Sequence, residues 1–351
     1  MPTIQEIMQT ANKAGASDVH ITVGIPPKMR VNGNLITMDY PRMAPQDTLE
    51  VAYSIMNDVQ KERFEERGEY DMSFSIPELG RYRVNVYKQR GSAAMALRLV
   101  GTVVPAPEKL GVPESVVNLY ERKRGLILVT GPTGSGKSTT LAAIIDKINN
   151  NRDAHVITLE DPIEYLHQHK MAMVNQREIG LDSQSYANAL RAALREDPDV
   201  ILVGEMRDFE TISVAITAAE TGHLVLSTLH TIGAASTVDR VIDVFPPYQQ
   251  QQIRVQLSAV LVCIISQSLV PNLTEDGRVA AFEVMHANPA VKNLIREGKS
   301  HQLQSVIQTS KREGMCTMDD YLLQLYMSRK ISRENCIQYA QNPDKMRSQL
   351  I

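Results

Sequence analysis

Apolar and polar residues alternate over the first hundred positions in the manner of short strands, after one amphipathic helix. Thr3 and Glu6 form a capping-box pattern ahead of an apolar stripe of helical spacing. A hairpin is predicted to turn at Asn32-Gly33, where both central residues need positive φ. Four other segments alternate as strands do: 19–24, 70–76, 81–89 and 94–100. The pattern predicts a small α+β domain over residues 1–100.

A proline-bearing stretch separates this domain from the remainder of the chain. Pro105, Pro107 and Pro113 disfavour regular structure, so residues 101–118 are predicted to form a linker and hinge. A second domain is then expected over residues 119–351.

The second domain alternates strands with helices. Four strands are apolar along their whole length, as expected when helices cover both faces of a parallel sheet: 126–130, 155–160, 200–204 and 224–229. After about Pro271 the pattern becomes helical, and helices are predicted to start at Asn288-Pro289 and at Thr317. We therefore expect an α/β domain with a helical C-terminal region over about 286–351.

The segment GPTGSGKST lies between a predicted strand ending at Thr130 and a predicted helix, the setting that the pattern G-x-x-x-x-G-K-[ST] requires. Its glycines let backbone N–H groups approach phosphate oxygens, and the helix start adds positive potential. Lys137 is expected to reach the β- and γ-phosphates and the Ser138 hydroxyl to ligate Mg²⁺, which predicts ATP and Mg²⁺ as cofactors. The predicted nucleotide-binding residues are Gly131, Pro132, Thr133, Gly134, Ser135, Gly136, Lys137, Ser138 and Thr139.

Two further apolar strands end in acidic residues. The segment DPDVILVGEMRD places Glu205 where a Walker B acid stands, suited to hold the Mg²⁺ shell through water or to orient the attacking water. The segment HVITLEDPIEY ends in Glu160, Asp161 and Glu164, and hydrolysis needs a carboxylate to polarise water. These acids are predicted to gather beside the phosphate loop.

Two histidines flank the strand of the segment TGHLVLSTLHT. A strand rises about 3.3 Å per residue, so His223 and His230 are too far apart to share one metal ion. Ligands of open parallel sheets lie at the carboxyl ends of the strands. We therefore predict that His230 contacts or senses the γ-phosphate, and that His223 serves a structural or intersubunit role.

Composition narrows the class of protein. The net charge of −3 and the aromatic content of 5% argue against a partner made of nucleic acid. The three cysteines are scattered, which predicts a reducing compartment and no metal cluster. The first residues lack the form of a signal peptide, and the longest apolar run is too short to span a bilayer, so a cytoplasmic protein is expected.

Taken together, GPTGSGKST, ITLEDPIEY, ALREDPDVILVGEMRD and ETGHLVLSTLHT closely resemble the Walker A, Asp box, Walker B and His box of the secretion/traffic ATPase superfamily. The segments ASDVHITVG and GRYRVNVYKQRG resemble that family's first domain, so the resemblance covers nearly the whole chain. The best match is to the members that retract type IV pili. No cysteine pair is present of the kind found in the zinc motif of many assembly and secretion members.

The resemblance implies a PAS-like N-terminal domain followed by a RecA-like P-loop ATPase domain. It also implies a homohexameric motor at the cytoplasmic face of the inner membrane, which hydrolyses ATP to drive pilus retraction and twitching motility. Its implied partners are an inner-membrane platform protein and other pilus machinery.

Motif positions carry the implied roles. Glu164 corresponds to the catalytic glutamate, Glu205 to the Walker B acid, and His223 with His230 to the His-box pair. Arginines on strands of the first domain are implied to reach a nucleotide across an interface, and the candidates are Arg81, Arg83 and Arg98. Retraction members carry a C-terminal AIRxG signature; here LIREGK, with Arg296, keeps its Ile-Arg and Gly.

Other functions remain as alternatives. A RecA-like nucleic-acid motor predicts stimulation by DNA, and a non-catalytic nucleotide-binding regulator predicts no turnover. Within the superfamily, the alternatives are a DNA-uptake or secretion ATPase and an accessory retraction ATPase.

The two histidines give a direct test. Alanine at His230 is expected to lower ATP turnover, because this residue lies at the ligand-binding edge of the sheet. Alanine at His223 is expected to leave turnover in place. Steady-state hydrolysis and nucleotide affinity are measured separately for each variant, and a loss of turnover through His223 alone would contradict the assignment.

Overall fold

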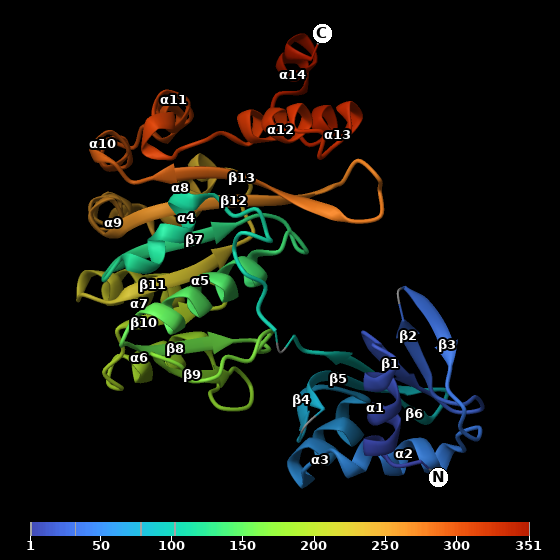
Figure 1. Ribbon diagram of the computed structural model, residues 1–351. Coiled ribbons are helices and arrows are strands. Elements are labelled where there is room, and N and C mark those ends of the chain that lie inside the picture. Colours follow the sequence, from blue (N-terminus) through green and yellow to red (C-terminus); the bar gives the residue numbers. More distant parts are fainter. Residues whose placement is uncertain (1, 32, 78, 102, 351) are drawn as a thin grey trace. The chain divides into compact units, whose positions relative to one another are not determined.

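The chain divides into two compact units, Met1–Val103 and Val104–Ile351. The structure is a computed structural model that describes residues 2–31, 33–77, 79–101 and 103–350 (Figure 1). Within the described residues, none of the helices has the length and apolar character that a membrane-spanning segment requires.

Among its described residues, the first unit forms an antiparallel sheet and three helices. The sheet has the order β3-β2-β1-β6-β5-β4. Its strands are β1 (Asp18–Ile21), β2 (Lys28–Val31), β3 (Asn34–Thr37), β4 (Glu69–Ile76), β5 (Gly80–Gln89) and β6 (Ser92–Leu99). Its helices are α1 (Ile4–Lys13), α2 (Pro45–Ser54) and α3 (Asp58–Arg67). One hydrophobic core joins all three helices to the sheet, with Phe64 and Met95 fully buried in it.

The predicted elements of this unit are present, although β1 ends at Ile21 and not at residue 24 as predicted. The backbone N–H of Thr3 donates to Glu6 Oε2 at 2.8 Å and the N–H of Glu6 to Thr3 Oγ1 at 3.2 Å, which completes the capping box of α1. Strands β2 and β3 pair with Val31 opposite Asn34. Gly33 has a φ of 82°, as the hairpin requires, while the predicted turn residue Asn32 lies outside the described residues.

The sequence interpretation missed α2 and α3, although α3 carries clear signals. Asn57 and Gln60 form a second capping box, and Gly68 ends the helix with a φ of 80°. Both signals were present in the sequence.

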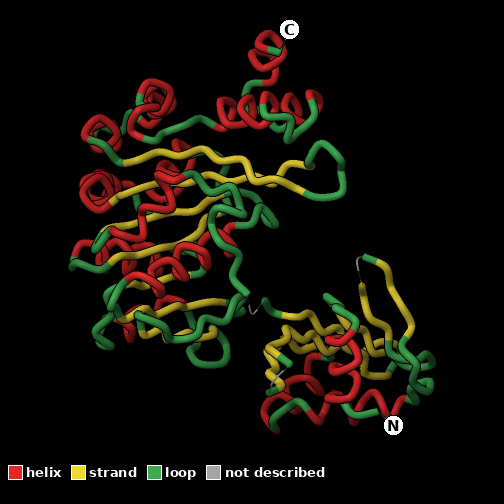
Figure 2. Tube along the Cα trace, in the orientation of Figure 1, coloured by secondary structure: helices red, strands yellow, loops and turns green. Residues whose placement is uncertain are grey.

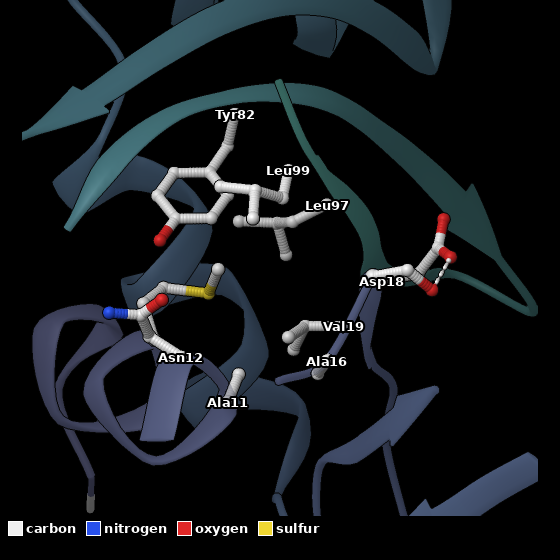
Figure 3. A pocket seen from close by; sticks show the side chains of 10 residues that line it. Ala11, Asn12, Ala16, Asp18, Val19, Tyr82, Leu97 and Leu99 are labelled. Carbon is white, nitrogen blue, oxygen red and sulfur yellow. Dashed lines mark hydrogen bonds between the residues drawn. The ribbon is translucent and has the colours of Figure 1, made fainter. Parts of the chain in front are cut away.

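A small cavity lies between α1 and the sheet of this unit (Figure 3). Its volume of 10 Å³ holds at most one water molecule, so it cannot admit a small-molecule ligand. Its lining includes Met8, Asn12, Asp18, Tyr82 and Leu97.

The second unit contains a seven-stranded sheet of order β13-β12-β7-β11-β10-β8-β9. All neighbours pair in parallel except β13, which runs antiparallel to β12. Its strands are β7 (Gly125–Thr130), β8 (His155–Glu160), β9 (Met173–Glu178), β10 (Val200–Val203), β11 (Leu224–Leu229), β12 (Leu261–Pro271) and β13 (Arg278–His286).

Helices cover both faces of this sheet (Figures 1 and 2). One face packs against α4 (Glu114–Val117) and α5 (Lys137–Asn151). The other face packs against α6 (Tyr186–Ala193), α7 (Phe209–Glu220), α8 (Ala234–Asp243) and α9 (Pro247–Val260). Every residue of β7, β10 and β11 is buried, so the prediction of a covered parallel sheet is confirmed.

Five short helices follow β13 in the described part of the chain, which reaches residue 350: α10 (Pro289–Arg296), α11 (Leu303–Thr309), α12 (Met318–Met327), α13 (Arg333–Gln338) and α14 (Pro343–Gln349). The described residues also include three 3₁₀ turns: η1 (Asn118–Glu121), η2 (Ser300–Gln302) and η3 (Lys311–Glu313). The two predicted helix starts are confirmed, because Asn288 Oδ1 accepts from the N–H of Val291 at 2.9 Å and Thr317 Oγ1 from that of Asp320 at 3.1 Å.

The prediction that the pattern becomes helical after about Pro271 is wrong for residues 278–286. These residues form β13, although Ala, Glu and Met within them favour helices. Pairing with β12 along nine residue pairs, from Cys263 opposite His286 to Pro271 opposite Arg278, overrides that local preference.

The stretch rich in proline is also partly ordered. Residues 104–113 contain no helix or strand, but α4 begins directly after Pro113, inside the predicted linker. Val116 and Val117 are buried against the sheet, which stabilises this short helix despite the neighbouring prolines.

Candidate nucleotide site

The parallel strands bring the predicted motifs to one edge of the sheet. Leu229 pairs with Thr130, and Val203 pairs with both Leu159 and Ser227. The segments that follow these residues therefore leave the sheet side by side. They are the phosphate loop after β7, the acidic turn after β8, Gly204-Glu205 after β10 and His230 after β11.

The loop between β7 and α5 depends on three glycines with positive φ. Gly131 has a φ of 141°, Gly134 of 78° and Gly136 of 87°. A Cβ on Gly131 would lie 2.2 Å from the backbone oxygen of Gln267, and one on Gly136 would lie 2.9 Å from its Nε2. A Cβ on Gly134 would meet no described atom within 4 Å. Gly131 and Gly136 are thus favoured for two reasons: their positive φ and the short distance between an added Cβ and Gln267 on β12.

Lys137 begins α5 and points back into the loop. Its Nζ donates to the carbonyl oxygens of Gly131 at 2.9 Å and Pro132 at 3.0 Å. Burial lowers the pKa of Lys137, and the carboxylates of Glu164 and Glu205 act in the opposite direction. The cation therefore lies within electrostatic reach of both predicted acids, where it can stabilise phosphate charge.

Gln267 on β12 holds the phosphate loop through hydrogen bonds. The sequence interpretation missed this residue. Its Nε2 donates to the Ser135 carbonyl oxygen at 2.8 Å, and its Oε1 accepts from Thr140 Oγ1 at 2.7 Å. The side chain is 3% exposed. A lone amide in the apolar run LVCIISQSLV was the available signal, since buried polar side chains need partners.

The carboxylates of the acidic turn after β8 lie in different environments. Glu160 accepts from Thr158 Oγ1 at 2.7 Å and Gln176 Nε2 at 3.2 Å, and burial raises its pKa. Glu164 is exposed. Its neighbour Tyr165 lies with its hydroxyl 3.1 Å from Thr139 Oγ1, which ties the turn to the phosphate loop. The turn contains a cis peptide bond between Asp161 and Pro162.

Glu205 and His230, predicted from separate motifs, meet in the structure. His230 Nε2 lies 3.5 Å from Glu205 Oε2, and Arg207 Nε contacts the same oxygen at 2.7 Å. Below them, Thr228 Oγ1 donates to the Gly204 carbonyl oxygen at 2.5 Å. This arrangement places an imidazole, a carboxylate and a guanidinium at the end of two adjacent strands.

Tyr186 was also missed, although it packs tightly beneath this group. A Cβ on Gly204 would lie 2.9 Å from the Tyr186 hydroxyl. Burial raises the pKa of that hydroxyl, with further contributions from Glu205, Asp161 and Glu160, so the phenol stays neutral among the acids. No sequence signal singled this tyrosine out.

His223 lies at the opposite end of β11. Its Nδ1 is 2.9 Å from the Ala218 carbonyl oxygen and 3.3 Å from Thr221 Oγ1. These contacts hold the end of α7 against the start of β11. The structure brings His230, but not His223, to the predicted site.

The chemistry of the residues in the site fits a phosphate-bearing ligand accompanied by Mg²⁺. Thr130 Oγ1 and Ser135 Oγ are buried without a hydrogen-bond partner among the described residues, and such hydroxyls need one. The Ser138 hydroxyl with the carboxylates of Glu164 and Glu205 supplies the oxygen donors that Mg²⁺ prefers. In the described parts of the chain, no group of three or more His, Cys, Asp and Glu side chains could hold a metal ion. Phosphate oxygens would therefore complete the shell around Mg²⁺.

Comparison with known proteins decides the family. A family model described as type II/IV secretion system protein matches residues 1–349. The type IV pilus retraction ATPase PilT of Pseudomonas aeruginosa is 48% identical over 341 residues, which cover 97% of this chain and 99% of that relative. A twitching motility protein of Neisseria gonorrhoeae is 48% identical over 320 residues, which cover 91% of this chain and 86% of the relative.

The chain belongs to the type II/IV secretion system protein family. Similarity to solved structures supports the same family assignment. A crystal structure of the pilus retraction motor PilT with bound ADP has a TM-score of 0.93 and 49% identity, covering 99% of this chain and all of that one. The ATPase DotB of Legionella pneumophila has a TM-score of 0.84 and 29% identity, over 95% and 93% of the two chains. The resemblance to secretion ATPases inferred from the sequence, and the predicted fold class, are confirmed.

The predicted arginines of this family member lie on described elements of the first unit and on α10. Arg83 and Arg98 are cross-strand partners on β5 and β6, and Arg81 lies on β5. Arg98 Nε donates to Asp18 Oδ1 at 2.8 Å, while its side chain stays 74% exposed. Arg296 is exposed at the end of α10. Their roles stay predictions.

Replacing Gly131 by alanine tests the contact with β12. We expect this variant to lose about 2–5 kcal/mol of stability, because positive φ and an overpacked Cβ act together. The matched control Gly134→Ala adds a Cβ in open space and is expected to lose about 1–2 kcal/mol. Urea unfolding measures both. Equal losses would show that packing against Gln267 does not constrain the loop.

Gln267→Met tests the support of the loop by β12. The change keeps the side chain's length and leaves Ser135 and Thr140 without their partners, so affinity for ADP should fall by about tenfold. Titration with a fluorescent ADP analogue measures it. The control Gln256→Met removes an amide of α9 that donates to Glu220 Oε2 at 2.9 Å, and this variant should bind as the parent does. A parent-like affinity of Gln267→Met would contradict the role.

Proposed function

We propose that this chain is a pilus retraction ATPase: a homohexameric motor that hydrolyses ATP and uses the energy to remove pilin subunits from type IV pili. The observation that carries the proposal is the meeting of Lys137, Glu164, Glu205 and His230 at one sheet edge, in a chain 48% identical to PilT along nearly its full length. The type IV pilus ATPase PilU of Pseudomonas aeruginosa is 40% identical, against 48% for PilT of that bacterium, which favours the main retraction ATPase over an accessory one.

Each residue of the site has a separate role in hydrolysis. Backbone N–H groups of the loop and Lys137 hold the triphosphate, with the start of α5 adding positive potential. Bound Mg²⁺ would be held by Ser138 and would neutralise phosphate charge. Glu164 is exposed beside the loop and accepts a proton from the attacking water. Glu205, held between Arg207 and His230, orients that water or the outer shell of the metal ion.

The remaining charge is supplied across a subunit interface. We assign this role to Arg81, Arg83 or Arg98 of a neighbouring subunit, because an arginine supplied in this way raises the rate of hydrolysis by about 10³–10⁵-fold. Hydrolysis then changes the position of the N-terminal unit through residues 103–113, the part of the predicted linker that precedes α4. In a closed ring, movement at one interface is passed to the next.

The partners and the location follow from the same proposal. The ring works at the cytoplasmic face of the inner membrane, on a platform protein of the pilus machinery. His223 contributes to the fixed packing of α7 against β11, and Arg296 belongs to a surface used in retraction.

Lys137→Ala tests catalysis by the phosphate loop. ATP hydrolysis by the purified oligomer should fall by about 10²-fold or more, because a preorganised charge at the phosphates is removed. The control Lys147→Ala changes a lysine at the other end of α5, which lies over the Tyr120 ring, and should retain activity.

The same variants test the cellular role. Cells that carry Lys137→Ala should show excess, immobile pili, whereas loss of an extension motor gives bare cells. Hydrolysis that persists in Lys137→Ala would contradict the assignment of the site. Bare cells would contradict retraction, and strong stimulation of turnover by DNA would favour a nucleic-acid motor.

A further inference from the structure

The loop Thr231–Ala234, which joins His230 to α8, is held by buried polar side chains. The N–H of Gly233 donates to Ser266 Oγ at 3.0 Å, and the N–H of Ala234 donates to Glu283 Oε1 at 2.7 Å. Ser266 is 1% exposed and Glu283 is fully buried. The loop that follows His230 is therefore fixed from β12 and β13, two strands late in the chain.

Glu283 receives hydrogen bonds from several elements at once. Its Oε2 accepts from the N–H of Met318 at 3.4 Å, from Gln341 Nε2 at 3.2 Å and from Gln304 Nε2 at 3.5 Å. Ala234 and Met318 are the first residues of α8 and α12, where the helix dipole favours a negative charge. The carboxylate is thus stabilised where it lies.

Burying a carboxylate in a protein core costs free energy, because the group loses its contacts with water. Apolar residues of similar volume at such positions are often neutral or stabilising, because they avoid the cost of desolvating a charge. A carboxylate that receives hydrogen bonds from four donors at such a place fits a role in specifying the position of those donors. The position that it specifies is the start of α8, four residues after His230.

We propose that Glu283 is a positioning residue for ATP hydrolysis, which keeps His230 against Glu205 by fixing the loop Thr231–Ala234 together with Ser266. The inference rests on the proposed function. Glu283 does not touch the phosphate loop: its described partners lie on α8, α11 and α12 and in the turn before α14. Its effect on the reaction therefore passes through the loop.

Glu283→Gln is the first experiment, made in the full-length oligomer. The amide keeps the shape of the side chain but presents an NH₂ group to one of the backbone donors. Turnover should fall by about tenfold, while KM for ATP changes by less than about twofold, because phosphate binding resides in the separate loop around Lys137. Comparable changes in kcat and KM would indicate a general loss of structure and overturn the proposal.

A double-mutant cycle gives the decisive readout. In a His230→Ala background, Glu283→Gln should lower turnover by less than about twofold, since the residue through which it acts is already gone. A structural defect would instead add in full to the effect of His230→Ala. Additive losses of turnover overturn the proposal.

Ser266→Ala tests the same loop from the other side and covers the case in which Glu283→Gln does not fold. The change is small, and it leaves the N–H of Gly233 without its acceptor. Turnover should fall by about threefold with KM unchanged, again without additivity to His230→Ala. Parent-like turnover of Ser266→Ala would count against positioning by the loop.

Asp319→Asn is the matched control for the C-terminal helices. Asp319 accepts from the N–H groups of Gln341 and Asn342 at 2.6 and 3.1 Å, so it anchors the same turn without touching α8. Its variant should retain turnover, and a loss equal to that of Glu283→Gln would attribute the effect to the helices instead. The unmodified protein separates the two proposals: if it does not hydrolyse ATP, the proposed function fails. If it does and Glu283→Gln matches it, only the positioning role fails.

Discussion

The parallel pairing of β7, β8, β10 and β11 is the constraint on which the rest of the second unit depends. Leu229 pairs with Thr130 and Val203 with Leu159, so strands far apart in the sequence end at the same edge. The polar residues that follow each strand are thereby collected without any need for contact between their own segments. Full burial of β7, β10 and β11 fixes this alignment, because a shift in register would expose or misplace apolar side chains on both faces.

A second constraint comes from the other side of β7. Strand β12 places the backbone oxygen and the amide side chain of Gln267 against the phosphate loop, so one side of the loop is packed against this strand. The glycines of the motif therefore have two physical reasons to be glycine. Their backbone angles are left-handed or nearly so, and two of them have no room for a Cβ beside Gln267. The next strand, β13, contributes Glu283 to the loop after His230, so the hairpin of β12 and β13 supports both ends of the site.

The first unit folds around its own core. Its cavity beside α1 is too small for a ligand, and its arginines at 83 and 98 lie side by side on neighbouring strands. In the proposed homohexamer, these exposed arginines would supply positive charge at the γ-phosphate of another subunit, from outside the phosphate loop. Under that proposal, the use of this unit in hydrolysis depends on assembly of the subunits.

The sequence by itself determined the features whose physical cause is local. Capping pairs such as Thr3 with Glu6, the apolar strands, and the strand–loop–helix order around Lys137 depend on neighbouring residues, and each was predictable. Helix α3 was predictable too, from Asn57, Gln60 and Gly68, although the interpretation passed over it. Tertiary structure decided what depends on distant partners. Strand β13 formed against its helical propensity because β12 was there to pair with it, and Gln267 supports a loop 132 residues earlier in the chain. Glu283 holds the start of a helix 49 residues before it. A local pattern carries no record of such contacts, because their energy arises only when folding removes both partners from water.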